Sequence, residues 1–447
     1  MQHTISHKTQ ELEFNDRITK KLAVQPQGGF TRAFLALKHR NFRLFWTGQL
    51  ISLIGTWMQT TGQAWLVLQL TKSAWALGIV GALQFLPVML FSLFGGVLAD
   101  RVPKRTVVLF TQSFAMLQAA VLWLLVATGT VQLWHIFVLA TLLGITNSVD
   151  MPTRQAFVVE MVGHEDLPNA VALNSSVFNM ARIIGPGLGG LIIAGLGIAP
   201  LFLLNALSFI PVIIGLALIN TKQLHTVLKP AVQQATVAKT GTLKSIREGL
   251  AYIRRKPSVL LIIIVVGIIS LFGINFNVVL PLFATDVLKA GPAGFGFISS
   301  AFGVGSLLSA LWLAWNNKKP DISFLLLASV VFCVLEMLFA ISHWYLLSLA
   351  LIACVGFTQI AFTAVSNTTL QTVTPDHLRG RIMSVYMLVF NGSIPLGNLF
   401  TGGLAHLFGA SIALLAGGGL SLIAAVTGWI FRAPAEKDIA RSLYHKE

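Results

Sequence analysis

The chain has 447 residues, of which 55% are hydrophobic and 11% are charged, and its mean hydropathy is +0.78. Soluble domains carry about 25% charged residues, so this composition argues against a soluble enzyme and against a DNA-binding protein, although the net charge is +15. The two cysteines, Cys333 and Cys354, both lie in apolar runs and predict neither a disulfide framework nor a zinc site.

Apolar runs dominate the chain from residue 44 onwards. A helix needs about 20 apolar residues to cross roughly 30 Å of hydrocarbon, and twelve runs meet this length. They are expected at 44–70, 75–99, 106–127, 132–156, 169–196, 199–220, 258–286, 293–315, 322–342, 345–370, 381–407 and 410–431. The predicted fold class is an all-α membrane protein with twelve transmembrane helices.

The basic residues orient these helices. With the N-terminus inside, 28 of the 31 Lys and Arg residues fall in cytoplasmic segments, Lys72 and Lys289 fall outside, and Arg182 lies within a span. This distribution follows the positive-inside rule and predicts that both termini are cytoplasmic. Topology and lipid contact therefore account for the basic excess, and no nucleic-acid partner is expected. The first forty residues have no apolar core, so they do not resemble a cleavable signal peptide.

The spans divide into two halves of similar size. We expect a cytoplasmic tail at 1–43, six helices at 44–220, a cytoplasmic linker at 221–257, six helices at 258–431 and a second tail at 432–447. In the linker, four apolar residues recur at helical spacing opposite basic ones, which predicts an amphipathic helix on the inner leaflet. They are Leu243, Ile246, Leu250 and Ile253. Short polar stretches recur at corresponding places, so the halves are predicted to be pseudo-symmetric, a layout typical of transporters.

Three groups of residues carry motif-like patterns. One is GVLADRVPKR from Gly96 to Arg105, between spans 2 and 3. Another is ARIIGPGLGG from Ala181 to Gly190, in span 5. The third comprises DMPTRQ (150–155), NALSF (205–209) and PDHLRGR (375–381). Together they resemble the major facilitator superfamily over about residues 36–430. Within it, they are similar to the branch of bacterial enterobactin-type siderophore exporters and macrolide-efflux relatives.

The resemblance implies a role for the first motif, in which Pro103 stands where a glycine is usual. In this family the loop is a cytoplasmic latch that favours the outward-facing state. Asp100 ends a helix where its carboxylate can face a helix N-terminus, and the basic residues can pair with Asp150. The expected latch residues are Gly96, Asp100, Arg101, Lys104, Arg105, Asp150 and Arg154. A plain positive-inside loop is the alternative.

The second motif resembles the antiporter motif of the family, with Ala181 in place of a glycine. Its expected residues are Gly185, Pro186, Gly189 and Gly190. Glycine permits close helix approach, and proline removes a backbone donor and can kink the helix. The resemblance implies export, whereas helix packing without any bearing on direction is the alternative.

Polar side chains in the apolar spans predict a central cavity, because such residues are costly in lipid. On span 1, five of them recur at steps of three and four and form one polar face. We expect substrate contacts from Gln49, Ser52, Thr56, Gln59, Gln63, Asn147, Arg182, Asn275, Asn367 and Asn391. Hydrogen bonding between helices is the alternative for this stripe and for each asparagine.

Arg182 lies about 18 Å into its span at 1.5 Å per residue, near mid-membrane, and it therefore needs a carboxylate, carbonyls or water around it. It is interpreted as a group that attracts an anionic substrate or fixes a gating hydrogen-bond network. A structural residue that holds carbonyls near the Gly185-Pro186 kink is the alternative. The candidates for proton coupling are Asp150 and Glu336, which lies inside span 9. A neutral Glu336 packed at a helix interface is the alternative.

These observations predict a monomeric, multi-pass exporter of the bacterial inner membrane. It would move an amphipathic small molecule, a siderophore or a drug, by alternating access and proton antiport. No nucleotide-binding loop, metal cluster or nucleophile–base pair is evident, so neither an enzyme nor a cofactor is expected. An importer of a nutrient or lipid-like solute, and a non-transporting receptor on a transporter fold, are the alternatives.

Overall fold

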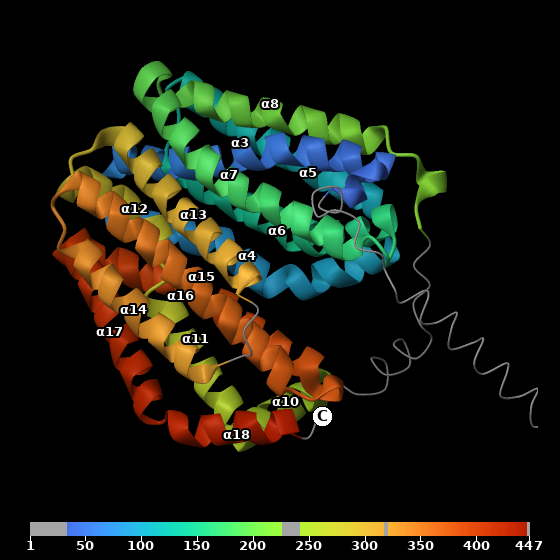
Figure 1. Cartoon of the computed structure of the whole chain (residues 1–447). Coiled ribbons are helices and arrows are strands. Elements are labelled where there is room, and N and C mark those ends of the chain that lie inside the picture. Colours follow the sequence, from blue (N-terminus) through green and yellow to red (C-terminus); the bar gives the residue numbers. More distant parts are fainter. Residues whose placement is uncertain (1–33, 226–241, 317–320, 445–447) are drawn as a thin grey trace, which may run out of the picture.

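The computed structural model describes residues 34–225, 242–316 and 321–444, and each element in these ranges is helical (Figure 1). The N-terminal half contains six long helices. They are α3 (Arg40–Thr71), α4 (Ala74–Arg101), α5 (Lys104–Ala127), α6 (Leu133–Val162), α7 (Leu167–Leu196) and α8 (Ile198–Ala217). Two short helices flank this half, η1 (Leu35–Lys38) and η2 (Thr221–Gln223).

The C-terminal half contains five unbroken spans and one broken span. The unbroken ones are α13 (Gly291–Trp315), α14 (Ile322–Ala340), α15 (Tyr345–Val373), α16 (Asp376–Phe408) and α17 (Ala410–Ile430). The broken span consists of α11 (Pro257–Phe272), α12 (Phe276–Leu282) and the π-helical η3 (Phe283–Val287). Two further helices, α10 (Thr242–Arg255) and α18 (Arg432–Tyr444), flank these spans.

Eleven described segments are long and apolar enough to cross a membrane. The first span, α3, is not among them although it has 32 residues, because glutamine and threonine interrupt its apolar sequence. With α3, the structure has the expected number of spans, and the predicted fold class is confirmed.

Glycines allow α3 to pack tightly inside the N-terminal half. Gly48, Gly55 and Gly62 recur at intervals of seven residues and all face α8. A Cβ atom at Gly48 would lie 2.5 Å from the Cα atom of Val212 on that helix, so only glycine permits this approach. Polar residues on the same side of α3 therefore lie between helices of one half.

The two halves meet through helix pairs α4–α16 and α7–α13. We call the end of the bundle that carries α10, α18 and the η1 helix the basic end, and the opposite end the far end. A Cβ atom at Gly402 would lie 2.9 Å from the Cα atom of Gly78, and one at Gly190 would lie 3.0 Å from the Cα atom of Gly296. All four glycines lie in the far-end portions of their helices. Figure 1 shows the two bundles approaching each other at this end and diverging towards the other.

The basic end of the C-terminal half is covered by α10 and α18 (Figure 1). An ion pair joins Arg381 of α16 to Glu248 of α10. Asp438 of α18 accepts hydrogen bonds from the Nζ atom of Lys256 at 2.9 Å and the Oγ atom of Ser258 at 2.5 Å. Residues 432–444, which we expected as part of a tail, thus form a helix that is attached to the first turn of α11.

Some predicted features lie outside the described residues. These are most of the tail expected at 1–43, the middle of the linker at 226–241 and the last three residues.

Candidate functional site

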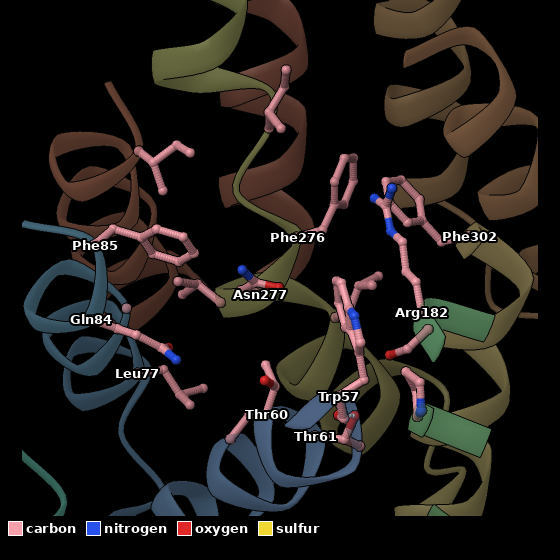
Figure 2. A pocket seen from close by; sticks show the side chains of 18 of the residues that line it. Trp57, Thr60, Thr61, Leu77, Gln84, Phe85, Arg182, Phe276, Asn277 and Phe302 are labelled. Carbon is pink, nitrogen blue, oxygen red and sulfur yellow. Dashed lines mark hydrogen bonds between the residues drawn. The ribbon is translucent and has the colours of Figure 1, made fainter. Parts of the chain in front are cut away.

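A cavity of about 380 Å³ lies between the two halves. Both halves contribute to its wall, through α3, α4 and α7 on one side and through α12, α13, α15 and α16 on the other. Aromatic residues from both halves line it, and its polar residues are almost all uncharged. The polar residues are Thr60, Thr61, Gln63, Gln84, Arg182, Asn277, Ser299, Gln359 and Thr363. Figure 2 shows five of them, Thr60, Thr61, Gln84, Arg182 and Asn277, around the open space.

Of the described residues that line the cavity, Arg182 alone carries a charged side chain. Its Cζ atom lies 4.7 Å from the centre of the Phe302 ring and 5.9 Å from that of Trp57. Both distances are within the range of cation–π attraction. Within the described residues, no hydrogen bond or ion pair to a carboxylate is found for Arg182. Its positive charge is therefore held by aromatic rings at the wall of the cavity (Figure 2).

The break in span 7 brings three neighbouring residues to the cavity. Helix α11 ends at Phe272 and α12 begins at Phe276, and Ile274, Phe276 and Asn277 line the cavity. The Nδ2 atom of Asn275 donates to the carbonyl of Leu271 at 2.8 Å. Asparagine side chains compete in this way with the helical hydrogen-bond pattern, which explains why the helix is interrupted here.

Two of the ten predicted substrate contacts, Gln63 and Arg182, line the cavity. The expectation that the whole polar stripe of α3 faces the cavity is wrong. Gln49, Ser52 and Gln59 are buried within the N-terminal half, and Thr56 lies on the same stripe. Gln59 accepts from Asn205 of α8 at 2.6 Å and donates to Gln118 of α5 at 3.0 Å. For Gln59, these bonds agree with the alternative of hydrogen bonding between helices.

The four asparagines expected at the substrate site lie elsewhere. Asn147 is half-buried in α6, and Asn391 is exposed on α16. Asn367 accepts a hydrogen bond from Gln371 at 2.5 Å on the same helix. Asn275 lines a second, much narrower gap, which also contains Glu336. Asn277, two residues further along, faces the cavity instead (Figure 2).

The aromatic and threonine face of α3 was not among the features predicted from the sequence. Trp57, Thr60 and Thr61 line the cavity next to Gln63. Both threonine hydroxyls donate to carbonyls one turn earlier, so their polar atoms are satisfied within the helix. The spacing of Trp57, Thr60, Thr61 and Ala64 places them on one side of the helix. This spacing is the pattern from which a second face of α3 could be predicted.

The residues expected to form the latch pair within their own half. The prediction that the basic residues of the loop after span 2 pair with Asp150 is wrong. Asp150 instead forms an ion pair with Arg154 and accepts from Thr111 at 2.6 Å and Gln112 at 3.0 Å. Buried as it is, this carboxylate needs such partners.

The basic residues of the same motif have other partners. Lys104 pairs with Glu160 at 2.6 Å. Arg105 donates to the carbonyls of Leu216 and Ala217, each at 2.7 Å, where α8 ends and a positive charge is favoured. Arg101 is exposed and Gly96 has nothing within 4 Å of a Cβ position. The side chain of Asp100 lies outside the described set. A latch between the halves therefore stays a prediction.

The predicted antiporter motif packs α7 between two other helices. Gly185 and Gly189 face α3 at Met58, whereas Gly190 and the carbonyl of Pro186 face Gly296 of α13. The motif thus lies at the contact between the halves. Its bearing on the direction of transport stays a prediction.

Comparisons with known proteins place the chain in a family. A family model described as transmembrane secretion effector matches residues 31–446. The staphyloferrin A transporter of Staphylococcus aureus is 26% identical over 370 residues, which cover 82% of this chain and 90% of that protein. The multidrug efflux pump Tap of Mycolicibacterium fortuitum is 29% identical over 360 residues, 79% of this chain and 86% of that one. The enterobactin exporter EntS of Escherichia coli is 25% identical over 374 residues, 82% and 85% respectively.

Solved structures share the fold. The bacterial homolog of the human lysosomal transporter Spinster, in an inward-facing and unoccupied conformation, has a TM-score of 0.66 at 11% identity. That match covers 93% of this chain and 99% of the other. The nucleoside transporter NupG has a TM-score of 0.68 at 14% identity and covers 89% and 99%. With twelve spans in two halves around one cavity, and a family model matching almost its full length, this chain is a membrane transporter that belongs to the transmembrane secretion effector family of the major facilitator superfamily.

Proposed function

We propose that this chain is a secondary active transporter that exports an anionic, amphipathic small molecule of the siderophore or drug class from the bacterial cytoplasm. It works as a monomer by alternating access and exchanges its substrate for protons. The observation that carries the proposal is Arg182, a cation at the wall of the central cavity with aromatic rings as its neighbours.

The surroundings of Arg182 favour an anion as substrate. A guanidinium in a partly desolvated site gains most from a partner of opposite charge, and it presents several donors in one plane. In the part of the chain that the structure describes, no acidic residue lines the cavity. An anionic group of the substrate would therefore fill the place that a carboxylate of the protein would otherwise take.

The rest of the lining favours an amphipathic substrate with aromatic or apolar surface. Trp57, Phe276 and Phe302 lie on the side of the space that holds Arg182, and Phe85 lies on the opposite side (Figure 2). Rings of this kind bind flat apolar groups by stacking and area burial, while amides such as Gln63 supply orienting hydrogen bonds.

Orientation follows from the distribution of basic residues. We take the basic end as cytoplasmic, which puts the contacts between the halves at the outer side of the membrane. In this arrangement the described state opens its cavity to the cytoplasm, as an exporter does when it takes up its substrate. The names of the relatives, two of which denote efflux or export, support this direction.

Substitution of Arg182 tests the proposal. Purified protein in proteoliposomes is loaded with an anionic dye, fluorescein, or a cationic dye, ethidium, and transport is followed by fluorescence under an imposed pH gradient. Since hydrogen bonds to charged groups contribute about 1.5–3 kcal/mol, Arg182→Gln is expected to lower fluorescein transport about 10- to 100-fold. Arg182→Lys keeps the charge and is expected to retain part of the activity.

Lys289→Gln removes a cation from the far end, outside the lining, and is the matched control. Unchanged fluorescein transport by Arg182→Gln would contradict a substrate role for Arg182. Transport of dye only towards the cytoplasmic face of the protein would favour the alternative of an importer. Absence of transport for every solute would favour a non-transporting receptor. Comparing extracellular metabolites of cells with and without the gene, with and without a protonophore, then identifies the natural substrate.

A further inference from the structure

Glu336 occupies a position that the cavity does not explain. It lies in α14, four residues before that helix ends, with 2% of its surface exposed, and its Oε2 atom has no hydrogen-bond partner in the described part of the chain. The carboxyl group faces a narrow gap that it shares with Asn275, Phe276 and Thr401. The Oδ1 atom of Asn275, which is 4% exposed, also has no partner among the described residues.

The gap suits a protonated carboxyl group. An ionised carboxylate buried without a cation is strongly disfavoured, and such a group takes up a proton instead. A protonated Glu336 gains an O–H donor, and the unpartnered oxygen of Asn275 is an acceptor in the same gap. Among the described residues, no basic side chain lines the gap, so a proton is the cation available to neutralise Glu336.

The helices around Glu336 bring few other titratable groups. Within the described residues, α11, α12 and α17 carry no acidic, basic, cysteine or tyrosine side chain. Helix α14 itself adds Cys333, one turn away, and α15 adds Tyr345 and Cys354. Helix α16 has Tyr386 and His406 within its span, with Asp376, His377, Arg379 and Arg381 at its basic end. None of these groups lines the gap.

The size of the gap excludes hydrated cations in the described state. It does not admit a sphere of the size of water, whereas a bound water needs at least about 10–15 Å³ of such space. A metal ion that keeps its water ligands needs more room still. A proton meets both the charge requirement and the space.

Phe276 connects this gap to the substrate cavity, because its side chain lines both. Its ring lies 5.0 Å from that of Phe302, the ring that faces Arg182. On the other side it lies 6.3 Å from Phe332, one helical turn before Glu336. The residue also begins α12, directly after the break at 273–275. The side chain of Phe276 thus borders both the gap that contains Glu336 and the substrate cavity.

We propose that Glu336, positioned by Asn275, is the proton-binding site of the transport cycle, and that Phe276 at the break in span 7 links its protonation to the cavity. In the described state Glu336 holds the proton and the gap is closed. Release of the proton leaves a carboxylate that requires water, so the gap must open, and α12 with Phe276 must move away from Glu336. This inference rests on the proposed exchange with protons.

Infrared difference spectroscopy tests the site without any substrate. Full-length protein in lipid is stepped through pH, and the carbonyl-stretch band of protonated carboxyl groups is recorded. We expect a titrating band that is lost in Glu336→Gln and retained in Asp286→Asn, a control at an exposed far-end carboxylate. Glu336→Asp is expected to keep the band, and Asn275→Ala is expected to keep it with a shifted midpoint, as a positioning role requires.

Transport assays test the coupling separately. Glu336→Gln is expected to retain counterflow of fluorescein, which needs only the cavity, and to lose accumulation driven by a pH gradient. A band that persists unchanged in Glu336→Gln would overturn the site, and so would gradient-driven accumulation that this variant retains. A response of band and transport to sodium in place of pH would also overturn it. If wild-type protein moves no solute while the band still depends on Glu336, the proton site stands and the proposed transport function fails.

Discussion

At the scale of single residues, polar side chains within the spans have two different environments. Some are satisfied inside one half, as Gln59 is by Gln118 and Asn205. Others face the space between the halves, as Arg182 and Asn277 do. Both groups follow helical periodicity, because each lies on one side of a helix. The partner helix on that side decides which environment a residue has.

The carboxylate of Asp438 leads to a prediction about pH. Burial raises the pKa of Asp438, but hydrogen bonds from Ser258 and Lys256 and the charge of Lys256 lower it, and the net pKa lies below its usual value. A carboxyl group whose pKa is lower in the folded state stabilises the fold above its unfolded pKa, about 3.9. This contribution is lost as the pH falls through the folded-state pKa.

We therefore expect Asp438→Asn to lower stability by about 1.5–3 kcal/mol near neutral pH. The difference from wild type should shrink as the pH falls below about 4. Thermal unfolding monitored by tryptophan fluorescence measures it. Asp376→Asn, at an exposed ion pair with Arg379, is the control and should change stability little. A difference that stays constant down to the lowest pH would contradict the assignment.

At the scale of helices, glycines determine how closely the two halves approach. Gly190 of α7 and Gly296 of α13 lie against each other, and so do Gly78 of α4 and Gly402 of α16. Helices in lipid associate through close packing of such small residues. Closure of the far end therefore depends on the absence of side chains at a few positions.

Enlarging one of these positions should open the far end. In Gly296→Val, the new side chain would collide with the backbone of Pro186 and Gly190, so we expect the population to shift towards a state with the far-end contacts separated. Spin labels at Thr130→Cys and His343→Cys, with both native cysteines replaced by alanine, report the far-end distance by electron paramagnetic resonance.

The longer distance should gain population in Gly296→Val. Gly195→Val places the same side chain on α7 where nothing lies within 4 Å, and it should leave the distribution unchanged. Identical distributions for wild type and Gly296→Val would show that the glycine contact does not limit opening.

At the scale of the whole molecule, the two bundles are internally bonded and meet along a limited surface. Within the described ranges, every ion pair joins residues of one half with each other or with its flanking helices. Among the described residues, the halves meet through close packing, the cation–π contact of Arg182 with Phe302 and the hydrogen bond from Ser300 to the carbonyl of Ile183. Such an interface can separate without breaking buried ion pairs, which suits rigid-body movement of the halves.

The orientation of the whole molecule is open to a direct test. Alkaline phosphatase, which is active only outside the cytoplasm, is fused after Thr130 at the far end or after Tyr444 at the basic end. We expect activity from the first fusion and none from the second, because the basic residues retain their end in the cytoplasm. Green fluorescent protein at the same two sites is the complementary control. The reverse pattern would invert the proposed direction of opening.

The sequence by itself determined the spans, their grouping into two halves and the presence of Arg182 near mid-membrane. These properties depend on local hydropathy and on the cost of charge in lipid, which a single helix already experiences. The same reasoning found the polar stripe of α3 and the buried acid Glu336.

Only the tertiary structure decided which way each polar face turns. A glycine row places Gln59 of α3 against α8, and so the neighbouring face with Trp57 and Thr60 lines the cavity. The break after Phe272 likewise directs Asn277, and not Asn275, into the cavity. The periodicity of polar and apolar residues and the composition are properties of one helix. The environment of a side chain depends instead on the helix packed against it, which is distant in sequence.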